Sequence, residues 1–450
     1  MKLENAKSIL SGLKNKKILI VGRGIEGRAV ERYLSSHLEG GKLELVDIKD
    51  GEDYLKKQKD YDIAVKSPGV KSELITIPYT TATNIFLSNS KGKVIGITGT
   101  KGKSTTSTLI FEMLKKQGMD VYLGGNIGQS PLDFIDKLNA NSWTVLEMSS
   151  FQLKDATVSP HIAVLLMLTQ EHLDYHKTLE SYIDAKRNIL RFQTPQDFAV
   201  INKDYLTSNE SDIYTAGQIF RISKEREVGE GCFIKEDSVW LSRDGKTGKI
   251  IDIERIKLLG RHNLENVCAA VCAAKLAGAS TSNIAKVLEE FGGLPHRLEY
   301  VGEKNGIPFY NDSLATVPEA AIEALKALPD TETLIAGGFD RGLDYSGLGQ
   351  YLNKGKIKTL ILFPPSGARI WEEICKARHH MVPGKATSEV SRPEKFDVTT
   401  MEQAVRIAAA ETQPGKVCLL SPASASFGTF KDYKDRGEQF KKAVGKISNF

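Results

Sequence analysis

Residues 96–107 read GITGTKGKSTTS, and their types and spacing suit phosphate binding. Gly99 and Gly102 let backbone N–H groups close around phosphate oxygens, because glycine has no Cβ in the way. A helix that begins at Lys103 adds a partial positive charge at its N-terminus. Lys103 is placed to reach the β- and γ-phosphates, and the Ser104 hydroxyl is placed to bind Mg²⁺. The stretch therefore predicts a nucleoside triphosphate site, although the first glycine of the Walker pattern is missing.

Acidic and histidine side chains follow two further apolar runs. The run WTVLEM delivers Glu147 at its end, where a phosphate loop needs an acid to hold the metal ion. The run HIAVLLML leads into TQEHLDYH, in which His172 is a candidate ligand for a second cation. An exposed glutamate at a strand end, or a polar loop with a stray pair of histidines, would read the same way. Lys186 lies nearby in SYIDAKRNILRF, and on its own it reads as a solvated helix lysine.

A second glycine pattern lies near the N-terminus. Residues 22–27 read GRGIEG between an expected strand and an expected helix, and Asp47 follows at the end of the next expected strand. This matches the dinucleotide fingerprint and predicts a Rossmann-like fold, with the acid placed for a ribose hydroxyl. The same glycines can seat any nucleotide diphosphate, so NAD is one candidate ligand among several.

Composition places the chain among globular proteins. The 450 residues are 41% hydrophobic and 26% charged, and the net charge of +5 does not demand nucleic acid. The N-terminal stretch has no apolar signal-peptide core, and no run is long and apolar enough to span a bilayer. The five scattered cysteines read as reduced, structural thiols. We expect a cytoplasmic protein that neither inserts into membranes nor binds nucleic acid.

Short apolar runs alternate with helical patterns in three segments, which predicts an α/β fold built on parallel sheets. We expect domains over residues 1–92, 93–297 and 298–450: a Rossmann-like domain, a P-loop ATPase-type domain and a Rossmann-like α/β domain. Residues 203–258 change to alternating apolar and polar positions around a Gly-rich turn, which predicts a small β excursion. The strands of the third segment run into Gly, Pro or Ser, so their carboxyl ends are expected to bind a ligand.

Taken together, these motifs resemble those of the Mur ligases, the ATP-dependent amino-acid-adding enzymes of peptidoglycan synthesis. The motifs that carry the resemblance are GITGTKGKST, LEMSSFQL, TQEHLDYH, YIDAKR, GRHNLEN, LPHR, NDSLAT and SPASASFGTFKDYKDRG. In this family the shortened glycine loop is the normal one. The C-terminal segment most resembles the branch that couples D-glutamate to UDP-N-acetylmuramoyl-L-alanine.

The resemblance implies a reaction that uses both nucleotide sites. A substrate carboxylate attacks the γ-phosphoryl of ATP to form an acyl phosphate, and the amine of D-glutamate then displaces phosphate. It implies two Mg²⁺ ions and a CO₂-derived carbamate on Lys186. The implied catalytic residues are Lys103, Glu147, His172 and Lys186, and the implied metal ligands are Ser104, Glu147, His172 and Lys186. We expect the enzyme to be a monomer.

The resemblance also assigns the binding residues. ATP falls to Thr100, Lys101, Gly102, Lys103, Ser104, Thr105, Thr106, Asn263, Asn266, Arg297 and Asp312. The UDP-sugar falls to Gly24, Ile25, Asp47, Ser67, Pro68, Gly69 and Asn126. D-Glutamate falls to Thr316, Arg341, Ser426, Phe427 and Tyr433.

Other functions remain open at this point. A sister ligase with a different amino acid, or a folylpolyglutamate-type synthetase, would share most of the motifs. The folate enzymes resemble the last two segments alone, so the first segment argues against them. An NAD-dependent oxidoreductase would not need the phosphate loop, and a non-enzymatic binding module would not need acid, histidine and lysine around one loop.

Overall fold

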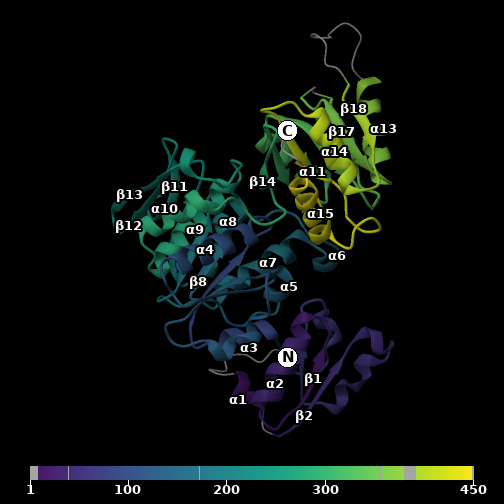
Figure 1. The fold of residues 1–450 in the computed structure, drawn as a ribbon. Coiled ribbons are helices and arrows are strands. Elements are labelled where there is room, and N and C mark those ends of the chain that lie inside the picture. The colour runs from purple at the N-terminus through teal and green to yellow at the C-terminus, as the bar shows by residue number, and fades with distance from the viewer. Residues whose placement is uncertain (1–8, 39, 172, 354–355, 380–391, 448–450) are drawn as a thin grey trace. The chain divides into compact units, whose positions relative to one another are not determined.

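The computed structural model describes residues 9–38, 40–171, 173–353, 356–379 and 392–447. It is an α/β structure with three sheets, one in each of the three segments expected from the sequence (Figure 1). The predicted fold class is confirmed, and the apolar runs WTVLEM and HIAVLLML contain strands. His172, one of the predicted site residues, lies outside the described residues.

The first sheet has the order β2-β1-β3-β4, and all its strand pairs are parallel. Its strands are β1 (Lys17–Val21), β2 (Lys42–Val46), β3 (Ile63–Lys66) and β4 (Tyr79–Thr81). The helices of this segment are α1 (Ile9–Leu13), α2 (Ile25–His37) and α3 (Ala82–Asn89). Its GRGIEG turn joins β1 to α2, as the dinucleotide fingerprint requires.

The second sheet has the order β13-β12-β11-β10-β9-β8-β5-β7-β6. Its strands are β5 (Lys93–Thr98), β6 (Val121–Gly125), β7 (Trp143–Glu147), β8 (Ile162–Leu165), β9 (Phe198–Asn202), β10 (Gln218–Ser223), β11 (Gly231–Lys235), β12 (Ser238–Arg243) and β13 (Lys246–Asp252). The predicted β excursion forms one edge of this same sheet, because β10 pairs in parallel with β9. The pairs β11–β12 and β12–β13 at that edge are antiparallel.

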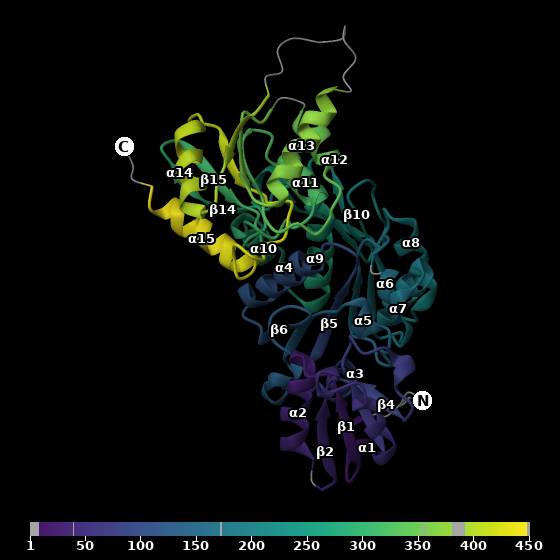
Figure 2. The same ribbon diagram turned by 90° about the vertical axis from the view of Figure 1, so that its right-hand side faces the viewer.

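Helices of the same segment accompany the second sheet. They are α4 (Lys103–Lys116), α5 (Ser150–Leu153), α6 (Leu173–His176), α7 (Leu179–Arg191), α8 (Leu206–Asn209), α9 (Asn263–Ala277) and α10 (Thr281–Glu290). Helix α4 packs against α9 (Figure 2). Thr178 and Ser280 cap α7 and α10 by accepting a backbone N–H, and Gly278 ends α9 in the left-handed conformation.

The third sheet has the order β14-β15-β19-β16-β17-β18. Its strands are β14 (Glu299–Lys304), β15 (Ile307–Asn311), β16 (Thr331–Gly337), β17 (Thr359–Phe363), β18 (Glu394–Asp397) and β19 (Val417–Leu420). Its helices are α11 (Pro318–Ala327), α12 (Ser346–Leu352), α13 (Ser366–His379), α14 (Met401–Glu411) and α15 (Tyr433–Gly445). The hairpin β14–β15 was not predicted, although Asn305 and Gly306 form the kind of positive-φ turn that hairpins favour.

The chain divides into two compact units. One holds residues 1–256 and 262–291, and the other holds residues 257–261 and 292–450. The first unit therefore contains both the first and the second sheet. A buried apolar cluster joins them, in which the rings of Phe86 and Phe134 meet edge to face at 6.1 Å. The boundary expected at residue 92 thus falls inside a unit with a shared core.

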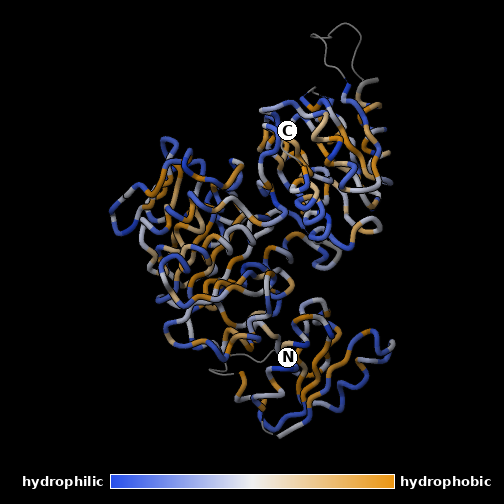
Figure 3. The backbone as a smooth tube through the Cα atoms, viewed as in Figure 1, coloured by the Kyte–Doolittle hydropathy of each residue, from blue (hydrophilic) through white to orange (hydrophobic). Residues whose placement is uncertain are grey.

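Hydrophobic residues concentrate in the sheets (Figure 3). Strands β5, β7 and β8 are almost wholly buried, as expected for parallel strands covered on both faces. The third sheet carries two further apolar clusters. No described helix is both long enough and apolar enough to cross a bilayer.

Candidate functional site

The turn between β5 and α4 is built around Gly102, whose φ of +84° falls in the left-handed region that glycine favours. A Cβ on Gly102 would lie 2.1 Å from Oδ1 of Asn266. The same oxygen accepts a hydrogen bond from the Thr106 hydroxyl at 3.4 Å. Asn266 comes from the start of α9 and donates to the side chain of Asn263, the first residue of that helix. The structure therefore brings both predicted asparagines to the glycine turn.

Two lysines bind the carbonyl groups of this turn. Lys103 Nζ donates to the carbonyl oxygens of Gly99 and Thr100, each at 3.0 Å. Lys186 Nζ donates to the same Gly99 oxygen at 2.9 Å, and to Thr98 Oγ1 at 3.3 Å. A single carbonyl oxygen thus accepts from two ammonium groups, so positive charge is concentrated beside the loop.

Lys186 is buried, with 2% of its surface exposed. Its Nζ lies 4.9 Å from the ring centroid of Tyr182, one helical turn earlier in α7. Burial, followed by repulsion from Lys103, lowers the pKa of Lys186 to about 7, and Glu171 and Glu147 oppose this shift. Lys186 is therefore a buried lysine whose amine is partly neutral near neutral pH, not the solvated helix lysine that its local sequence suggests.

Thr100 connects the loop to the segment that follows β8. Its hydroxyl donates to the carbonyl of Thr169 at 3.0 Å and accepts the Thr169 N–H at 2.9 Å. The hydroxyl of Tyr182 lies 3.1 Å from Thr100 Oγ1. Lys101 forms an ion pair with Glu171 at 2.8 Å. Thr169 and Glu171 are thus held against the phosphate loop, as the carboxyl ends of neighbouring parallel strands predict.

Glu147 is the last residue of β7 and lies beside Ile97 of β5 in the sheet register. It is 1% exposed, and its Oε1 accepts a hydrogen bond from Asn126 Nδ2 at 2.7 Å. Within the described part of the chain its Oε2 has no hydrogen-bond partner. A buried carboxylate oxygen without a donor is suited to bind a cation. Glu147 therefore fits the metal-binding role predicted for it.

The other predicted metal ligands are placed as follows. Ser104 lies in the first turn of α4, next to Lys103, and Lys186 binds the same Gly99 carbonyl as Lys103. Among the described residues, no group of three or more His, Cys, Asp or Glu side chains could hold a metal by itself. Phosphate oxygens would have to complete the coordination shell, as is usual for Mg²⁺ bound with a nucleotide.

The two ligand loops of the first sheet are packed together. A Cβ on Gly22, whose φ is +107°, would lie 2.7 Å from Ser67, and the Ser67 hydroxyl donates to the Gly22 carbonyl at 3.2 Å. Asp47 accepts the Arg23 N–H at 2.7 Å, which contributes to lowering the pKa of this carboxyl. Ile25 is 73% exposed. The predicted residues Gly24, Ile25, Asp47 and Ser67–Gly69 therefore share the carboxyl edge of one sheet.

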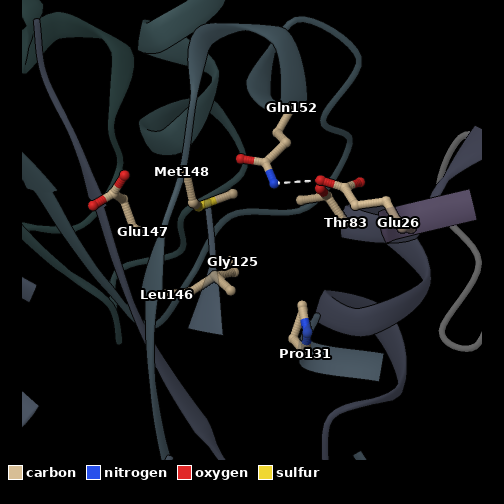
Figure 4. A pocket seen from close by; sticks show the side chains of 9 residues that line it. Glu26, Thr83, Gly125, Pro131, Leu146, Glu147, Met148 and Gln152 are labelled. Carbon is tan, nitrogen blue, oxygen red and sulfur yellow. Dashed lines mark hydrogen bonds between the residues drawn. The ribbon is translucent and has the colours of Figure 1, made fainter. Parts of the chain in front are cut away.

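Glu26 extends from the same turn towards the second sheet. Its Oε1 accepts a hydrogen bond from Gln152 Nε2 at 2.6 Å (Figure 4). Both residues line a cavity of about 10 Å³, about the room that one water molecule needs. Glu147 lines the same cavity. Burial raises the pKa of Glu26, and its Oε2 is paired with no donor in the described residues.

The remaining predicted residues lie in the second compact unit. Asp312 follows β15 and accepts hydrogen bonds from Ser421 Oγ at 2.8 Å and from the Leu298 N–H at 3.2 Å. Burial raises the pKa of Asp312 to about 7, and Arg297 opposes that shift. Thr316 lies in the loop between Asp312 and α11.

An aromatic and cationic cluster lies at the carboxyl end of β16. The Arg341 guanidinium lies 5.4 Å from the ring centroid of Phe427, and the rings of Phe427 and Phe339 meet edge to face at 6.2 Å. Both rings are about half exposed, and neighbouring Ser426 is buried. The structure therefore brings together Arg341, Ser426 and Phe427, which were predicted to bind one amino acid.

Two residues of the site were not predicted. Arg436 is fully buried in α15 and donates to Ser313 Oγ at 2.9 Å and to the Ser424 carbonyl at 3.0 Å, so it joins the NDSLAT and SPASAS loops. Burial lowers its pKa to about 9 despite the nearby Asp312. Ser313 Oγ also donates to the Tyr433 carbonyl at 2.8 Å. Tyr182 is the second residue that was not predicted. Its position one helical turn before Lys186 could have indicated that the two side chains meet.

Two family descriptions match the chain. The Mur ligase middle domain matches residues 97–274, and the Mur ligase glutamate ligase domain matches residues 296–424. The first match contains Lys103, Glu147 and Lys186, and the second contains Asp312 and Arg341. Together they cover most of the second and third segments.

Named relatives match along the whole chain. The UDP-N-acetylmuramoylalanine–D-glutamate ligase of Symbiobacterium thermophilum is 35% identical over 461 residues, covering 99% of this chain and 98% of its own. The protein of the same name from Geobacillus kaustophilus is 37% identical, covering 96% and 98%. The crystal structure of the MurF ligase of Thermotoga maritima with ADP superposes with a TM-score of 0.57 at 19% identity, covering 99% and 98%. That last likeness concerns the fold.

The packing at the glycine turn gives a testable expectation for Gly102→Ala. We expect it to lower the free energy of unfolding by about 1–3 kcal/mol more than Gly118→Ala, because only the former places a Cβ against Asn266. Gly118 is the matched control, since its φ is +81° and a Cβ added there would have no atom within 4 Å. Urea unfolding measures both, and equal losses would contradict the steric argument.

The buried amine gives an expectation about pH. Unfolded Lys186 keeps its proton up to about pH 10.4, whereas the folded protein releases it above about pH 7. Between these values the unfolded state binds more protons, so its formation becomes harder as pH rises. Relative to Lys186→Met, the wild type should gain up to about 1.4 kcal/mol of stability per pH unit between pH 7 and pH 10.

Urea unfolding at pH 7, 8 and 9 measures this difference. Lys91→Met is the control, because Lys91 is exposed and its removal should leave the pH profile parallel to that of the wild type. Parallel profiles for Lys186→Met and the wild type would show that the pKa of Lys186 is not lowered in the folded protein.

Proposed function

The chain belongs to the Mur ligase family of ATP-dependent ligases, which form amide bonds in peptidoglycan precursors, and from that premise we propose its particular step. We propose that it adds D-glutamate to UDP-N-acetylmuramoyl-L-alanine and releases ADP and phosphate. The full-length relatives carry the name of that reaction. The observation that carries the proposed chemistry is that Lys103 and Lys186 share the Gly99 carbonyl, while Glu147, at the register position beside Ile97, has a donor-free oxygen.

The first step joins two anions, so it depends on charge neutralisation. The carboxylate oxygen of the substrate attacks the γ-phosphorus of ATP, the bond to the β–γ bridging oxygen breaks, and ADP leaves. Lys103 swings from the Gly99 and Thr100 carbonyls to the transferred phosphoryl group. Ser104 and Glu147 would hold one Mg²⁺, with His172 as the ligand proposed for a second. When bound, Mg²⁺ neutralises charge on the phosphate oxygens.

The second step forms the amide. The neutral amine of D-glutamate attacks the acyl phosphate carbon, the bond from that carbon to the phosphate oxygen breaks as phosphate leaves from the tetrahedral intermediate, and the nitrogen releases one proton to water. The remaining ATP contacts are assigned to Thr100, Lys101, Gly102, Thr105, Thr106, Asn263, Asn266, Arg297 and Asp312. Thr106 and both asparagines already surround the glycine turn, which supports their part in this assignment.

Lys186 is proposed to carry a carbamate. Its amine nitrogen attacks the carbon of CO₂ and releases a proton, which converts a cation into an anionic metal ligand. Burial and the proximity of Lys103 favour this reaction, because they lower the pKa of Lys186 to about 7 and so raise the fraction of neutral amine. The new anion would lie near both Lys103 and Glu147, where a cation can bind both carboxylate-like groups.

The two remaining substrates are assigned to separate sets of residues. Gly24, Ile25, Asp47, Ser67, Pro68, Gly69 and Asn126 are assigned to the UDP-sugar. Thr316, Arg341, Ser426, Phe427 and Tyr433 are assigned to D-glutamate. The Arg341 guanidinium can bind a carboxylate through two parallel hydrogen bonds. A cytoplasmic location, a monomeric state and the domain limits 1–92, 93–297 and 298–450 remain predictions.

The proposed step is tested with a panel of amino acids. Purified protein, ATP, Mg²⁺ and UDP-N-acetylmuramoyl-L-alanine should release ADP with D-glutamate and not with L-alanine, L-lysine or meso-diaminopimelate. Lys103→Ala should reduce that release by at least about 100-fold while the fold stays intact, because a preorganised charge at the phosphoryl group is lost. Coupling with a different amino acid would identify a sister ligase, and normal turnover by Lys103→Ala would remove the lysine from the mechanism.

The carbamate is tested separately by Lys186→Ala. We expect this variant to lose nearly all ligase activity and to recover part of it in added acetate, which can occupy the place of the missing anion. Lys91→Ala is the control at an exposed position. It should keep its ligase activity, and added acetate should not increase that activity. If acetate does not help the variant and bicarbonate does not affect the wild type, the carbamate is excluded.

A further inference from the structure

A buried ion pair joins the first sheet to the second. Lys66, the last residue of β3, and Asp155, two residues after α5, meet at 2.9 Å with side chains that are 0% and 3% exposed. The Lys66 ammonium also donates to the Val70 carbonyl at 2.8 Å. One ammonium therefore holds the turn 67–70, which follows β3, against the segment that follows α5.

Asp155 is fully engaged at this junction. Its carboxylate accepts hydrogen bonds from the Ser72 hydroxyl at 2.8 and 3.0 Å and from the Tyr79 hydroxyl at 2.9 Å. Its backbone carbonyl accepts the Asn84 side-chain N–H at 2.9 Å. All these donors belong to the first segment. Asp155, in the second segment, therefore accepts the hydrogen bonds that hold the end of the first sheet in place.

Two further contacts join the same loops. The Tyr175 hydroxyl of α6 donates to the Pro68 carbonyl at 3.2 Å. Gln152 of α5 donates to Glu26, in the other ligand loop of the first sheet. Helix α5 begins three residues after Glu147, and α6 follows the TQEH segment. Both loops of the first sheet are thus tied to α5, which follows Glu147, and to α6.

Lys66 cannot itself contact a bound ligand, because its side chain has no exposed surface and its ammonium is surrounded by acceptors. Stability alone does not explain the pair either. Two charges lose their hydration on burial, and apolar replacements of buried ion pairs are often as stable as the original. What the pair adds is a fixed orientation, since its hydrogen bonds are directional and apolar contacts are not.

We propose that Lys66, acting through Asp155, is a positioning residue that fixes the turn 67–70 relative to α5, so that one sugar nucleotide can reach both the first sheet and the metal site. This inference rests on the proposed function. The first-sheet loops can bind a nucleotide by themselves, whereas the whole substrate must span two anchored ends. Binding at both ends gains from a matched separation and loses when that separation changes.

The test compares a ligand that spans the junction with ligands that do not. Dissociation constants of UDP-N-acetylmuramoyl-L-alanine, UDP and ADP are measured by calorimetry for the wild type and Lys66→Met. We expect Lys66→Met to raise the dissociation constant of the sugar nucleotide by at least about 10-fold, because a displacement of about 1 Å misaligns one end of the bound ligand. The dissociation constants of UDP and ADP should change by less than about 2-fold, since each ligand binds on one side of the junction.

Two variants separate positioning from stability. Lys66→Met/Asp155→Leu removes the uncompensated buried carboxylate, so its melting temperature should return towards that of the wild type while the weak sugar-nucleotide binding persists. Lys57→Met is the control, because it breaks an ion pair with Glu44 near the surface of the same segment. It should leave the dissociation constants of all three ligands unchanged.

The outcomes are distinct. Equal weakening of UDP and the sugar nucleotide, or recovery of sugar-nucleotide affinity in the double variant, would overturn the positioning role while leaving the proposed function in place. A wild type that binds ADP and neither uridine nucleotide would overturn the proposed function, and the positioning role with it.

Discussion

The central site depends on one carbonyl oxygen, that of Gly99, which accepts hydrogen bonds from the ammonium groups of both Lys103 and Lys186. Two like charges at a shared acceptor repel each other, and burial of Lys186 removes the water that would screen them. The arrangement favours any change that places negative charge between the lysines. A nucleotide phosphate or a carbamate would each do so, which is why the glycine turn, the buried amine and the donor-free oxygen of Glu147 are parts of one electrostatic arrangement.

Parallel sheet geometry supplies the positions. Strands β5, β7 and β8 end at the same edge of the second sheet, so residues far apart in sequence gather there without any special local conformation. The first sheet repeats this arrangement, with Gly22 packed against Ser67. The two edges belong to a single compact unit, and the Lys66–Asp155 pair, the Glu26–Gln152 bond and the Tyr175–Pro68 bond connect them. A connection made of directional, largely buried contacts suits a ligand that must be held at two ends.

In the second compact unit a buried charge also holds ligand loops together. Arg436 crosses from α15 to the loops that contain Ser313 and Ser424, and burial shifts its pKa and that of Asp312 in opposite directions. Arg436 thereby ties those loops together from the interior, whereas Arg341 and Phe427 are exposed. A guanidinium beside an aromatic ring, supported by a rigid loop, is suited to select a carboxylate-bearing ligand.

Much of this could be predicted from the sequence, because the signals are local. Apolar runs indicated the parallel strands, the glycines at 99 and 102 indicated the turn, and Glu147 and Asp47 were recognised by their place after a strand. Only the tertiary structure decided which charges are buried and with whom they pair. Lys186 was interpreted as a solvated lysine, and nothing in the sequence indicated that Lys66 or Arg436 is buried, since a lysine or arginine carries the same local pattern whether it faces water or the interior. Their partners, which are Asp155, the Gly99 carbonyl and Ser313, are distant in sequence, and local periodicity carries no information about such contacts.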